Sequence, residues 1–289
     1  MLVLLEVRGY FSSKEHHTVS VDTSNAGELM ITFDITFPNA PCPALHPDIM
    51  DFSGLRNENA RVSFEKVRLD RQGKTIGTDS TVIPPVGNEF FSTKCFSCYG
   101  AKPADECCNT CDSLVEAFKD AGMDFDKILP IAPQCRQRYY VSQVEKFAGE
   151  GCRIRGSIAA NKFPGNLHFA AGVAVEKASY HGHIVEGLER IPNFNFSHRI
   201  NKLYFGDHDP SIRCPLEGEE KSVGDNSFLF SYHLRLVNSI LVKKGKQSLN
   251  AYEYSTTQNT SKSESTESLT GVFFHYEISP MLMERRIEN

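Results

Sequence analysis

The stretch Leu29-Met-Ile-Thr-Phe-Asp-Ile-Thr-Phe37 has a period of two. Every odd position carries a large apolar side chain, and the even positions carry Met, Thr, Asp and Thr. This period is typical of a β-strand that buries one face. Pro41 and Pro43 follow shortly afterwards and indicate where the strand ends. The stretch therefore predicts a half-buried strand over residues 29–37.

Similar patterns recur along the chain and favour more strands. Residues 62–69 predict a second strand, with a bulge where the phase slips between Phe64 and Val67. Further strand faces are expected at residues 152–158, 167–169, 228–236 and 272–278. Strands and helices do not alternate regularly, so a doubly wound parallel sheet is not expected. The order instead predicts a mainly β chain folded as an antiparallel β-sandwich.

Two helices are expected between the early and late strands. The first runs from about Asp112 to Ala121, with Asp112 or Ser113 as its cap and Gly122 at its end. Its apolar stripe is formed by Leu114, Val115 and Phe118. A second, weaker helical pattern covers residues 134–147. We therefore predict one domain over residues 1–289 that carries a cysteine-rich, partly helical insertion at residues 92–152.

The cysteines gather in this insertion. The chain has nine, and all except Cys42 and Cys214 fall between residues 95 and 152. Their spacing fits structural disulfides that hold a loop with few apolar side chains, and it leaves the connectivity open. It also fits a zinc site, with four thiolates from Cys95, Cys98, Cys108 and Cys111. A third hypothesis is disulfide exchange by Cys108 and Cys111, because Cys111 precedes a predicted helix.

The composition of the chain and the motifs that it lacks argue against several classes of protein. The net charge is −5 and there is no basic block, which argues against a nucleic-acid partner. The sequence contains no Gly-rich phosphate loop, no G-x-S-x-G elbow and no H-E-x-x-H motif, so we do not expect an enzyme. No apolar run is long enough to cross a bilayer. Neither a cofactor nor a bound metal ion is predicted.

Two other groups of residues suggest modification or pH sensing. Asn195 and Asn259 lie in N-x-S/T sequons and are candidate glycosylation sites. Histidines titrate near pH 6.5, so a cluster of them could respond to a mildly acid compartment. The candidates are His181, His183, His198 and His208. Ordinary surface or turn histidines would explain the same pattern.

The cysteine motif and several blocks around it resemble a known family. Cys95-Phe-Ser-Cys98 with Cys107-Cys108-Asn-Thr-Cys111 is similar to the signature of the endoplasmic reticulum–Golgi intermediate compartment protein family. The similarity is greatest to the lumenal domain of the larger subunit of its two-subunit retrograde cargo receptor. Matching blocks outside the insertion are 34–38, 151–156, 161–169, 196–206 and 276–281.

The resemblance implies a function and a location. It implies a lumenal domain that binds cargo proteins and retrieves resident proteins of the endoplasmic reticulum. It also implies a smaller related subunit as partner. The expected location is the lumen of the endoplasmic reticulum, intermediate compartment and cis-Golgi. The membrane helices that flank this domain in the family are missing here, so we expect either an excised domain or an unusual soluble member.

The resemblance also implies roles for single residues. It places cargo binding on Cys95, Cys98, Cys107, Cys108, Cys111, Leu114, Val115 and Phe118. Packing of the helix against the sheet would equally explain the last three. An oxidising lumen implies disulfides among Cys42, Cys95, Cys98, Cys107, Cys108, Cys111, Cys135 and Cys152. Cys214 departs from the family pattern and is predicted to be a free or intermolecular thiol.

Overall fold

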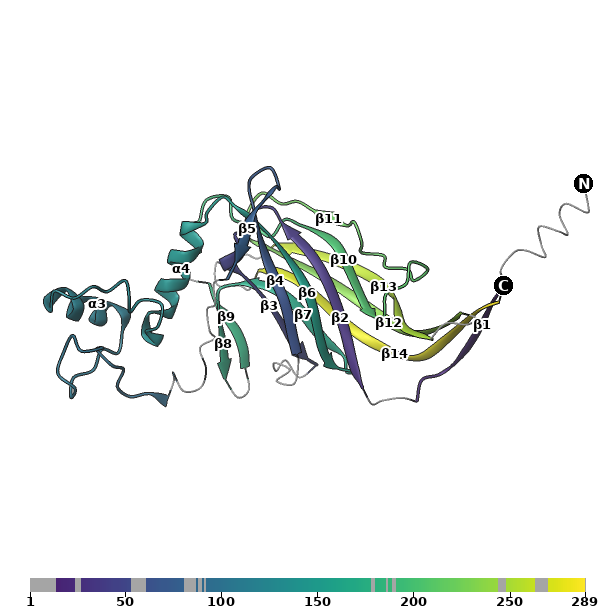
Figure 1. The fold of residues 1–289 in the computed structure, drawn as a ribbon, viewed down its shortest axis with the longest axis horizontal. Coiled ribbons are helices and arrows are strands. Elements are labelled where there is room, and N and C mark those ends of the chain that lie inside the picture. Colours follow the sequence, from purple (N-terminus) through teal and green to yellow (C-terminus); the bar gives the residue numbers. More distant parts are fainter. Residues whose placement is uncertain are drawn as a thin grey trace, which may run out of the picture.

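The structure is a computed structural model. It describes residues 14–23, 27–52, 61–80, 87, 90, 92–177, 180–185, 187–188, 191–243, 248–262 and 270–288. Twelve of its strands form one continuous sheet, which folds over on itself so that two halves pack face to face. The helical insertion lies at one end of this sandwich, and β1 with the end of β14 lies at the other (Figure 1).

The first half of the sheet contains the predicted strand 29–37. Its order is β10 (His198–Gly206), β2 (Glu28–Phe37), β6 (Gly151–Asn161), β4 (Arg61–Leu69) and β5 (Thr75–Asp79). The odd-numbered side chains of β2 from Leu29 to Phe37 are all buried, and Met30 on the opposite face is 40% exposed. The alternation in the sequence therefore identified the inner face correctly.

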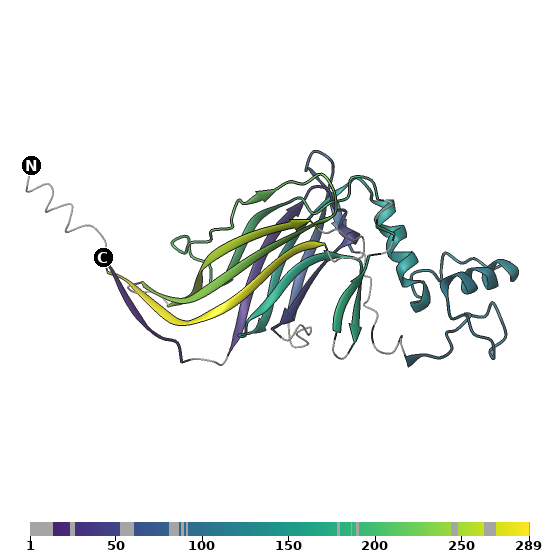
Figure 2. The same ribbon diagram turned by 180° about the vertical axis from the view of Figure 1, so that it is seen from behind.

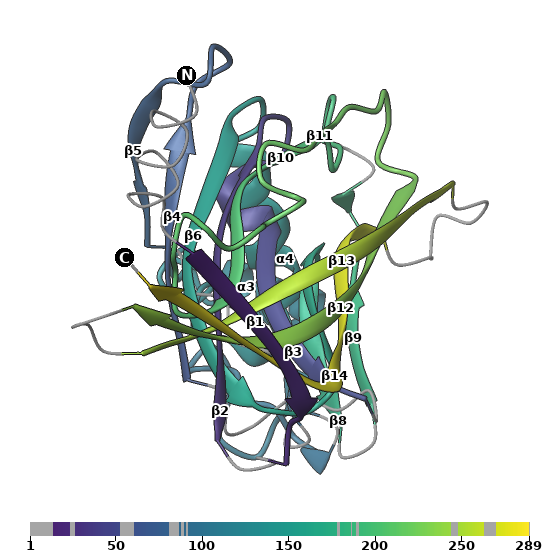
Figure 3. The same cartoon turned by 90° about the vertical axis from the view of Figure 1, so that its right-hand side faces the viewer.

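The second half contains the late strands. Its order is β3 (Leu45–Asp51), β7 (Gly165–Ala171), β14 (Gly271–Glu288), β12 (Phe228–Lys243) and β13 (Leu249–Lys262). Two further strands pair at the periphery: β1 (Lys14–Val21) with β14, and β11 (Glu220–Lys221) with β10. β10 and β13 join the halves through only two residue pairs. Figures 2 and 3 show the strands of the two halves crossing at a steep angle.

Aromatic side chains from both halves fill the space between them. The Phe169 ring of β7 lies 5.3 Å from Phe33 and 5.7 Å from Phe37 of β2, measured between ring centroids. Within the second half, Tyr232 stacks on Phe274 at 5.0 Å. Such aromatic pairs add to the free energy gained by removing their apolar area from water. The predicted mainly β class with a disulfide-rich insertion is confirmed.

Two details differ from the sequence-based expectation. β12 and β14 pair in parallel, whereas the other ladders of the sheet are antiparallel among the described residues. The bulge expected between Phe64 and Val67 is wrong, because the β4–β6 ladder runs through this region without a shift. Val62 and Phe64 lie on the inner face of β4 but are 40% and 41% exposed, whereas Val67 is buried on the opposite face. The apolar residues therefore change face along a regular strand, and no extra residue is needed to explain the pattern.

A separate two-stranded hairpin follows β7 directly. β8 (Val173–Lys177) and β9 (Tyr180–Ile184) pair only with each other. Gly172 connects the hairpin to β7 with a φ of +106°, and a Cβ there would lie 2.5 Å from the carbonyl oxygen of Ile184. Only glycine fits such a close approach of two backbones. This turn lets the hairpin fold back toward β7.

Candidate functional site

The insertion is held together by three disulfides of its own. Cys95 is bonded to Cys107, Cys98 to Cys108, and Cys111 to Cys135. A fourth disulfide, Cys42–Cys152, joins the short helix η1 (Cys42–Ala44) to the start of β6, where the chain returns from the insertion. The sequence left this connectivity open, because adjacent cysteines such as Cys107 and Cys108 have several partners within reach.

These pairings bear on the two alternative hypotheses for the cysteines. A zinc site would need free thiolates at Cys95, Cys98, Cys108 and Cys111, and all four are oxidised here. Disulfide exchange would need Cys108 and Cys111 to act as a pair, but each is bonded elsewhere, and Cys108 is fully buried. Both alternatives are wrong for this arrangement of bonds.

The first predicted helix is α3 (Cys111–Asp120). Its N-cap is Thr110, which corrects the expected Asp112 or Ser113. The Thr110 hydroxyl accepts a hydrogen bond from the Ser113 backbone N–H, and the Ser113 hydroxyl accepts one from the Thr110 N–H. This reciprocal arrangement satisfies two donors at the start of the helix. Gly122, with φ +67°, ends it as predicted.

The apolar stripe of α3 packs inside the insertion. Leu114 and Phe118 are 0% and 1% exposed, and Val115 is half-buried. Leu114 and Phe118 belong to a small cluster with the buried cysteines, and Phe125 packs edge-on against Phe118 at 5.7 Å. This burial corrects the expectation that these two side chains contact cargo directly. Their packing is also not helix-to-sheet, because the cluster is separate from the core of the sandwich.

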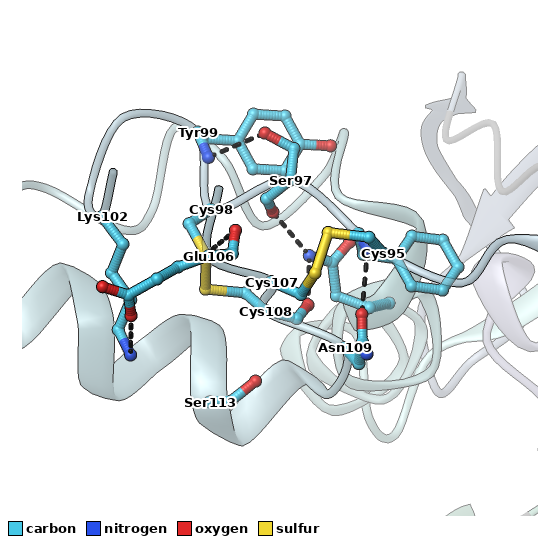
Figure 4. The surroundings of a disulfide bond; sticks show 12 residues. Cys95, Ser97, Cys98, Tyr99, Lys102, Glu106, Cys107, Cys108, Asn109 and Ser113 are labelled. Carbon is cyan, nitrogen blue, oxygen red and sulfur yellow. Dashed lines mark hydrogen bonds and ion pairs between the residues drawn. A yellow bond between two sulfur atoms is a disulfide. The ribbon is translucent and has the colours of Figure 1, made fainter. Parts of the chain in front are cut away.

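Side-chain hydrogen bonds reinforce the loop around the disulfides. The Gln134 amide donates to the carbonyls of Ser97 and Cys108, both at 3.0 Å. The Asn109 side chain accepts from the Phe96 N–H at 2.9 Å and donates to the Lys94 carbonyl at 3.3 Å. Figure 4 shows Asn109 beside the Cys95–Cys107 disulfide, above α3. Disulfides and amide bridges therefore replace the secondary structure that this loop lacks.

The second predicted helix anchors the insertion on the sandwich. α4 (Arg136–Lys146) follows the short helix η2 (Pro133–Cys135). The buried Tyr140 hydroxyl donates to the Ala44 carbonyl at 3.2 Å and accepts from the Gly172 N–H at 2.7 Å. After the helix, Glu150 receives two hydrogen bonds from the Arg68 guanidinium of β4, at 2.6 and 2.7 Å. These contacts fix the insertion at its base.

One segment of the insertion, residues 105–126, is rich in acidic side chains: seven carboxylates are exposed, and Lys119 is the one cation within it. Three of the seven form ion pairs with cations outside the segment, which are Glu106 with Lys102, Asp112 with Arg138 and Asp124 with Lys127. Two large apolar side chains, Met123 at 42% and Ile131 at 62%, are also exposed on the insertion. Neither residue could be singled out from the sequence, because neither belongs to a periodic apolar stripe.

The free cysteine and the two sequons lie outside the insertion. Cys214 is half-buried as a thiol, and burial and then the nearby Glu217 and Glu253 raise its pKa to about 11. Asn259 is exposed on β13. Asn195 is 4% exposed, and its amide nitrogen donates to the Asn193 carbonyl. A glycan at Asn195 would have to displace this packing, so Asn259 is the sequon that we expect to be used.

Of the four histidines considered as pH sensors, only His208 is exposed. His198 lies in the core, and its Nε2 is 2.7 Å from the Tyr232 hydroxyl. Burial lowers the pKa of His198 to about 4, so it stays neutral in a mildly acid compartment. His181 and His183 face a third histidine in the interior. The insertion itself contains no histidine.

The geometry defines a class of protein: a β-sandwich that presents a rigid, oxidised insertion. Family models match two parts of the chain. The model for the endoplasmic reticulum vesicle transporter matches residues 98–289, and the model for the N-terminal part of endoplasmic reticulum–Golgi intermediate compartment proteins matches residues 1–58. The chain therefore belongs to the endoplasmic reticulum vesicle transporter family. Within the described residues, no helix has the length and apolar character needed to span a membrane.

Individual relatives are similar over much of the chain. The probable endoplasmic reticulum–Golgi intermediate compartment protein 3 of Dictyostelium discoideum is 32% identical over 98% of this chain and 77% of that protein. The ER-derived vesicles protein ERV46 of Saccharomyces cerevisiae is 33% identical over 71% of this chain, which spans about half of that protein, 52%. The crystal structure of Erv41p shares the fold, with a TM-score of 0.52 and 18% identity, over 94% of this chain and 99% of that one.

Proposed function

We propose that this chain is the lumenal cargo-binding domain of a receptor that cycles between the endoplasmic reticulum and the Golgi and retrieves resident proteins. Its family consists of vesicle transport proteins, and its relatives are named for the intermediate compartment and for vesicles derived from the endoplasmic reticulum. The chain operates in this early secretory system. In this proposal it binds proteins without chemical turnover and is held at the membrane in the native protein.

One observation carries the proposal most directly: disulfides cross-link the insertion, and much of its surface is exposed to solvent. Three disulfides within about 40 residues stabilise a part of the chain too small to fold through its own apolar core. A rigid surface loses little conformational entropy on binding, which favours affinity. Disulfides of this kind also suit the oxidising lumen of the secretory pathway.

The acidic segment at residues 105–126 supports a cargo with basic character. Four of its seven exposed carboxylates lie outside the ion pairs described above and would attract basic segments, and exposed Met123 and Ile131 would provide apolar contact area. In this account the insertion, rather than the cysteine sulfurs themselves, is the cargo surface. The cysteines named as cargo-binding residues act by holding that surface in shape.

A related subunit of the same family completes the proposed receptor. The Erv41p structure shares the fold of this chain, and the ER-derived vesicles protein ERV46 is similar to it in sequence. We propose that this chain pairs with such a smaller relative, as a hetero-oligomer. Co-purification of the two native proteins from membranes would support this pairing, and recovery of each subunit free of the other would contradict it.

The test of the function is a retrieval assay. Cells that lack this protein are grown, and resident proteins of the endoplasmic reticulum are measured in the medium by quantitative mass spectrometry. The proposal expects several resident proteins to be secreted, and expects the re-expressed native protein to restore their retention. A mutant cell line with an unchanged secreted set would contradict the proposal.

A further inference from the structure

Four buried side chains converge on one point between the β8–β9 hairpin and the sheet. They are Asp48 of β3, His168 of β7, and His181 and His183 of β9. The Nε2 atoms of His183 and His168 are 3.4 Å apart, and those of His183 and His181 are 3.2 Å apart. The Asp48 Oδ2 atom lies 3.6 Å from His183 Nε2 and 3.8 Å from His181 Nε2.

The topology explains why these residues meet. Asp48 and His168 are direct cross-strand partners in the β3–β7 ladder, so their side chains share one face of the sheet. His181 and His183 are two residues apart on β9 and therefore point to the same side of that strand. The turn at Gly172 folds the hairpin back so that both imidazoles reach the Asp48–His168 pair.

Without a metal ion this cluster is unfavourable. The buried Lys66 ammonium interacts electrostatically with Asp48, but it donates its hydrogen bond to the Cys42 carbonyl at 3.1 Å and leaves Asp48 Oδ2 without a donor from the part of the chain that the structure describes. The four side chains are 8% exposed or less. Among the described residues, no hydrogen-bond donor lies within reach of Asp48 Oδ2, which leaves a buried carboxylate oxygen unsatisfied. The Nε2 atoms of His181 and His183 lie 3.8 and 3.6 Å from that oxygen, and the ligand atoms of all four residues lie within 4.8 Å of one another. An unsatisfied buried polar group in a native protein calls for an explanation such as a bound ion.

A tetrahedral zinc ion fits the distances and the donors. Zinc binds histidine nitrogen and carboxylate oxygen at about 2.0–2.2 Å, so neighbouring ligand atoms lie roughly 3.3 Å apart. Four of the six ligand separations are 3.2 to 3.8 Å, close to this value, and all six are within 4.8 Å. Imidazole ligands suit zinc and related transition-metal ions better than they suit calcium or magnesium.

We propose that Asp48, His168, His181 and His183 bind one zinc ion that fastens the β8–β9 hairpin to the sheet. Four protein ligands close a tetrahedral shell, which is typical of structural rather than catalytic zinc sites. The sequence predicted no metal, because only His181 and His183 are neighbours in the chain. The ligands differ from the cysteine thiolates considered above, and the site lies on the sandwich rather than in the insertion.

The test measures metal in the native oxidised protein. After removal of loose metal by a mild chelator and gel filtration, inductively coupled plasma mass spectrometry is expected to find about one zinc ion per chain. The H181Q/H183Q variant is expected to retain at most roughly one tenth of the zinc that the wild-type protein retains. The variant His208→Gln, which alters an exposed histidine outside the cluster, and Cys214→Ser are matched controls that keep the ion.

A second measurement keeps the proposal testable if the double variant does not fold. Wild-type protein stripped of metal and supplied with Co²⁺ is expected to give the visible spectrum of tetrahedral nitrogen and oxygen ligation, without a thiolate charge-transfer band. Zinc is also expected to raise the melting temperature of the stripped protein. A native protein with no retained metal and no response to Co²⁺ or zinc overturns the proposal, as does a folded H181Q/H183Q variant that binds zinc like the wild type.

Discussion

Single buried side chains have chemistry that differs from what their residue type suggests. His198 illustrates this at the centre of the core: Phe37, Phe230 and Tyr232 surround its ring, and Nδ1 lies 2.9 Å from the Phe196 carbonyl. Burial is the largest cause that lowers its pKa from 6.5 to about 4. From the sequence, His198 is one of four candidate pH sensors, and only the structure shows that it is buried.

The buried imidazole predicts a pH dependence of stability. Between pH 6.5 and about 4, the His198 side chain takes up a proton in the unfolded chain but not in the folded one. The free energy of unfolding therefore falls as the pH falls through this window, by about 3 kcal/mol from this residue. Denaturant titrations at several pH values, with disulfides intact, should show a smaller loss in the variant His198→Phe. An identical loss in the variant and the wild type would contradict this assignment.

Cys214 gives a second prediction at this scale. Its pKa of about 11, against an ordinary 9.0, leaves about 100-fold less reactive thiolate at neutral pH. Alkylation of the folded protein is therefore expected to be much slower than that of a free cysteine. Thiol titration of the denatured, unreduced protein should then find one group per chain, since the eight other cysteines are bonded. Rapid labelling of the folded monomer would disprove the buried placement.

At the scale of elements, the insertion and the sandwich are stabilised by different means. The sandwich buries large aromatic and aliphatic side chains from both halves of the sheet. The insertion has a small cluster in which three of the seven fully buried residues are cysteines. Its folded state therefore depends on covalent bonds that restrict the unfolded chain. The two parts should respond separately when disulfides are removed.

Removal of one insertion disulfide tests this independence. The C98A/C108A variant should lose roughly 3 kcal/mol of stability within the insertion. Limited proteolysis is expected to cut the variant between residues 92 and 135 and to leave the sandwich intact. The matched variant C42A/C152A removes the bond that ties η1 to β6 and should lower the stability of the sandwich itself. Equal loss of the sandwich in both variants would show that the insertion is not independent.

The sequence predicted elements better than it predicted pairings. The predictions of a strand at residues 29–37 and of a helix ending at Gly122 rest on patterns among residues close in the chain. The observed β2 and α3 match these predictions closely. The parallel pairing of β12 with β14 depends on contacts between distant segments. The disulfide connectivity and the meeting of Asp48 with His183 depend on the same long-range contacts. Local patterns contain no information about such pairings.

At the scale of the whole molecule, the insertion and the ends of the described chain lie at opposite ends of the sandwich (Figure 1). The sandwich forms the rigid body, and Tyr140 with the Arg68–Glu150 ion pair fixes the insertion at one end of it. The termini of the described chain lie at the opposite end (Figure 1). The insertion, to which Met123 and Ile131 belong, therefore lies far from β1 and the end of β14. This arrangement suits a receptor that reaches for soluble partners.

The proposed cargo surface on the insertion can be tested directly, because two of its apolar side chains, Met123 and Ile131, are exposed. The variant M123D/I131D replaces side chains that are 42% and 62% exposed, so the four disulfides should still form. The control Phe163→Asp changes a side chain that is 53% exposed on the sandwich. Both are expressed in cells that lack the native protein, and secreted resident proteins are quantified in the medium. We predict that cells expressing M123D/I131D secrete the resident proteins as cells without the protein do, and that cells expressing Phe163→Asp retain them as wild-type cells do. Full retention in cells expressing M123D/I131D would contradict the proposal that the insertion is the cargo surface.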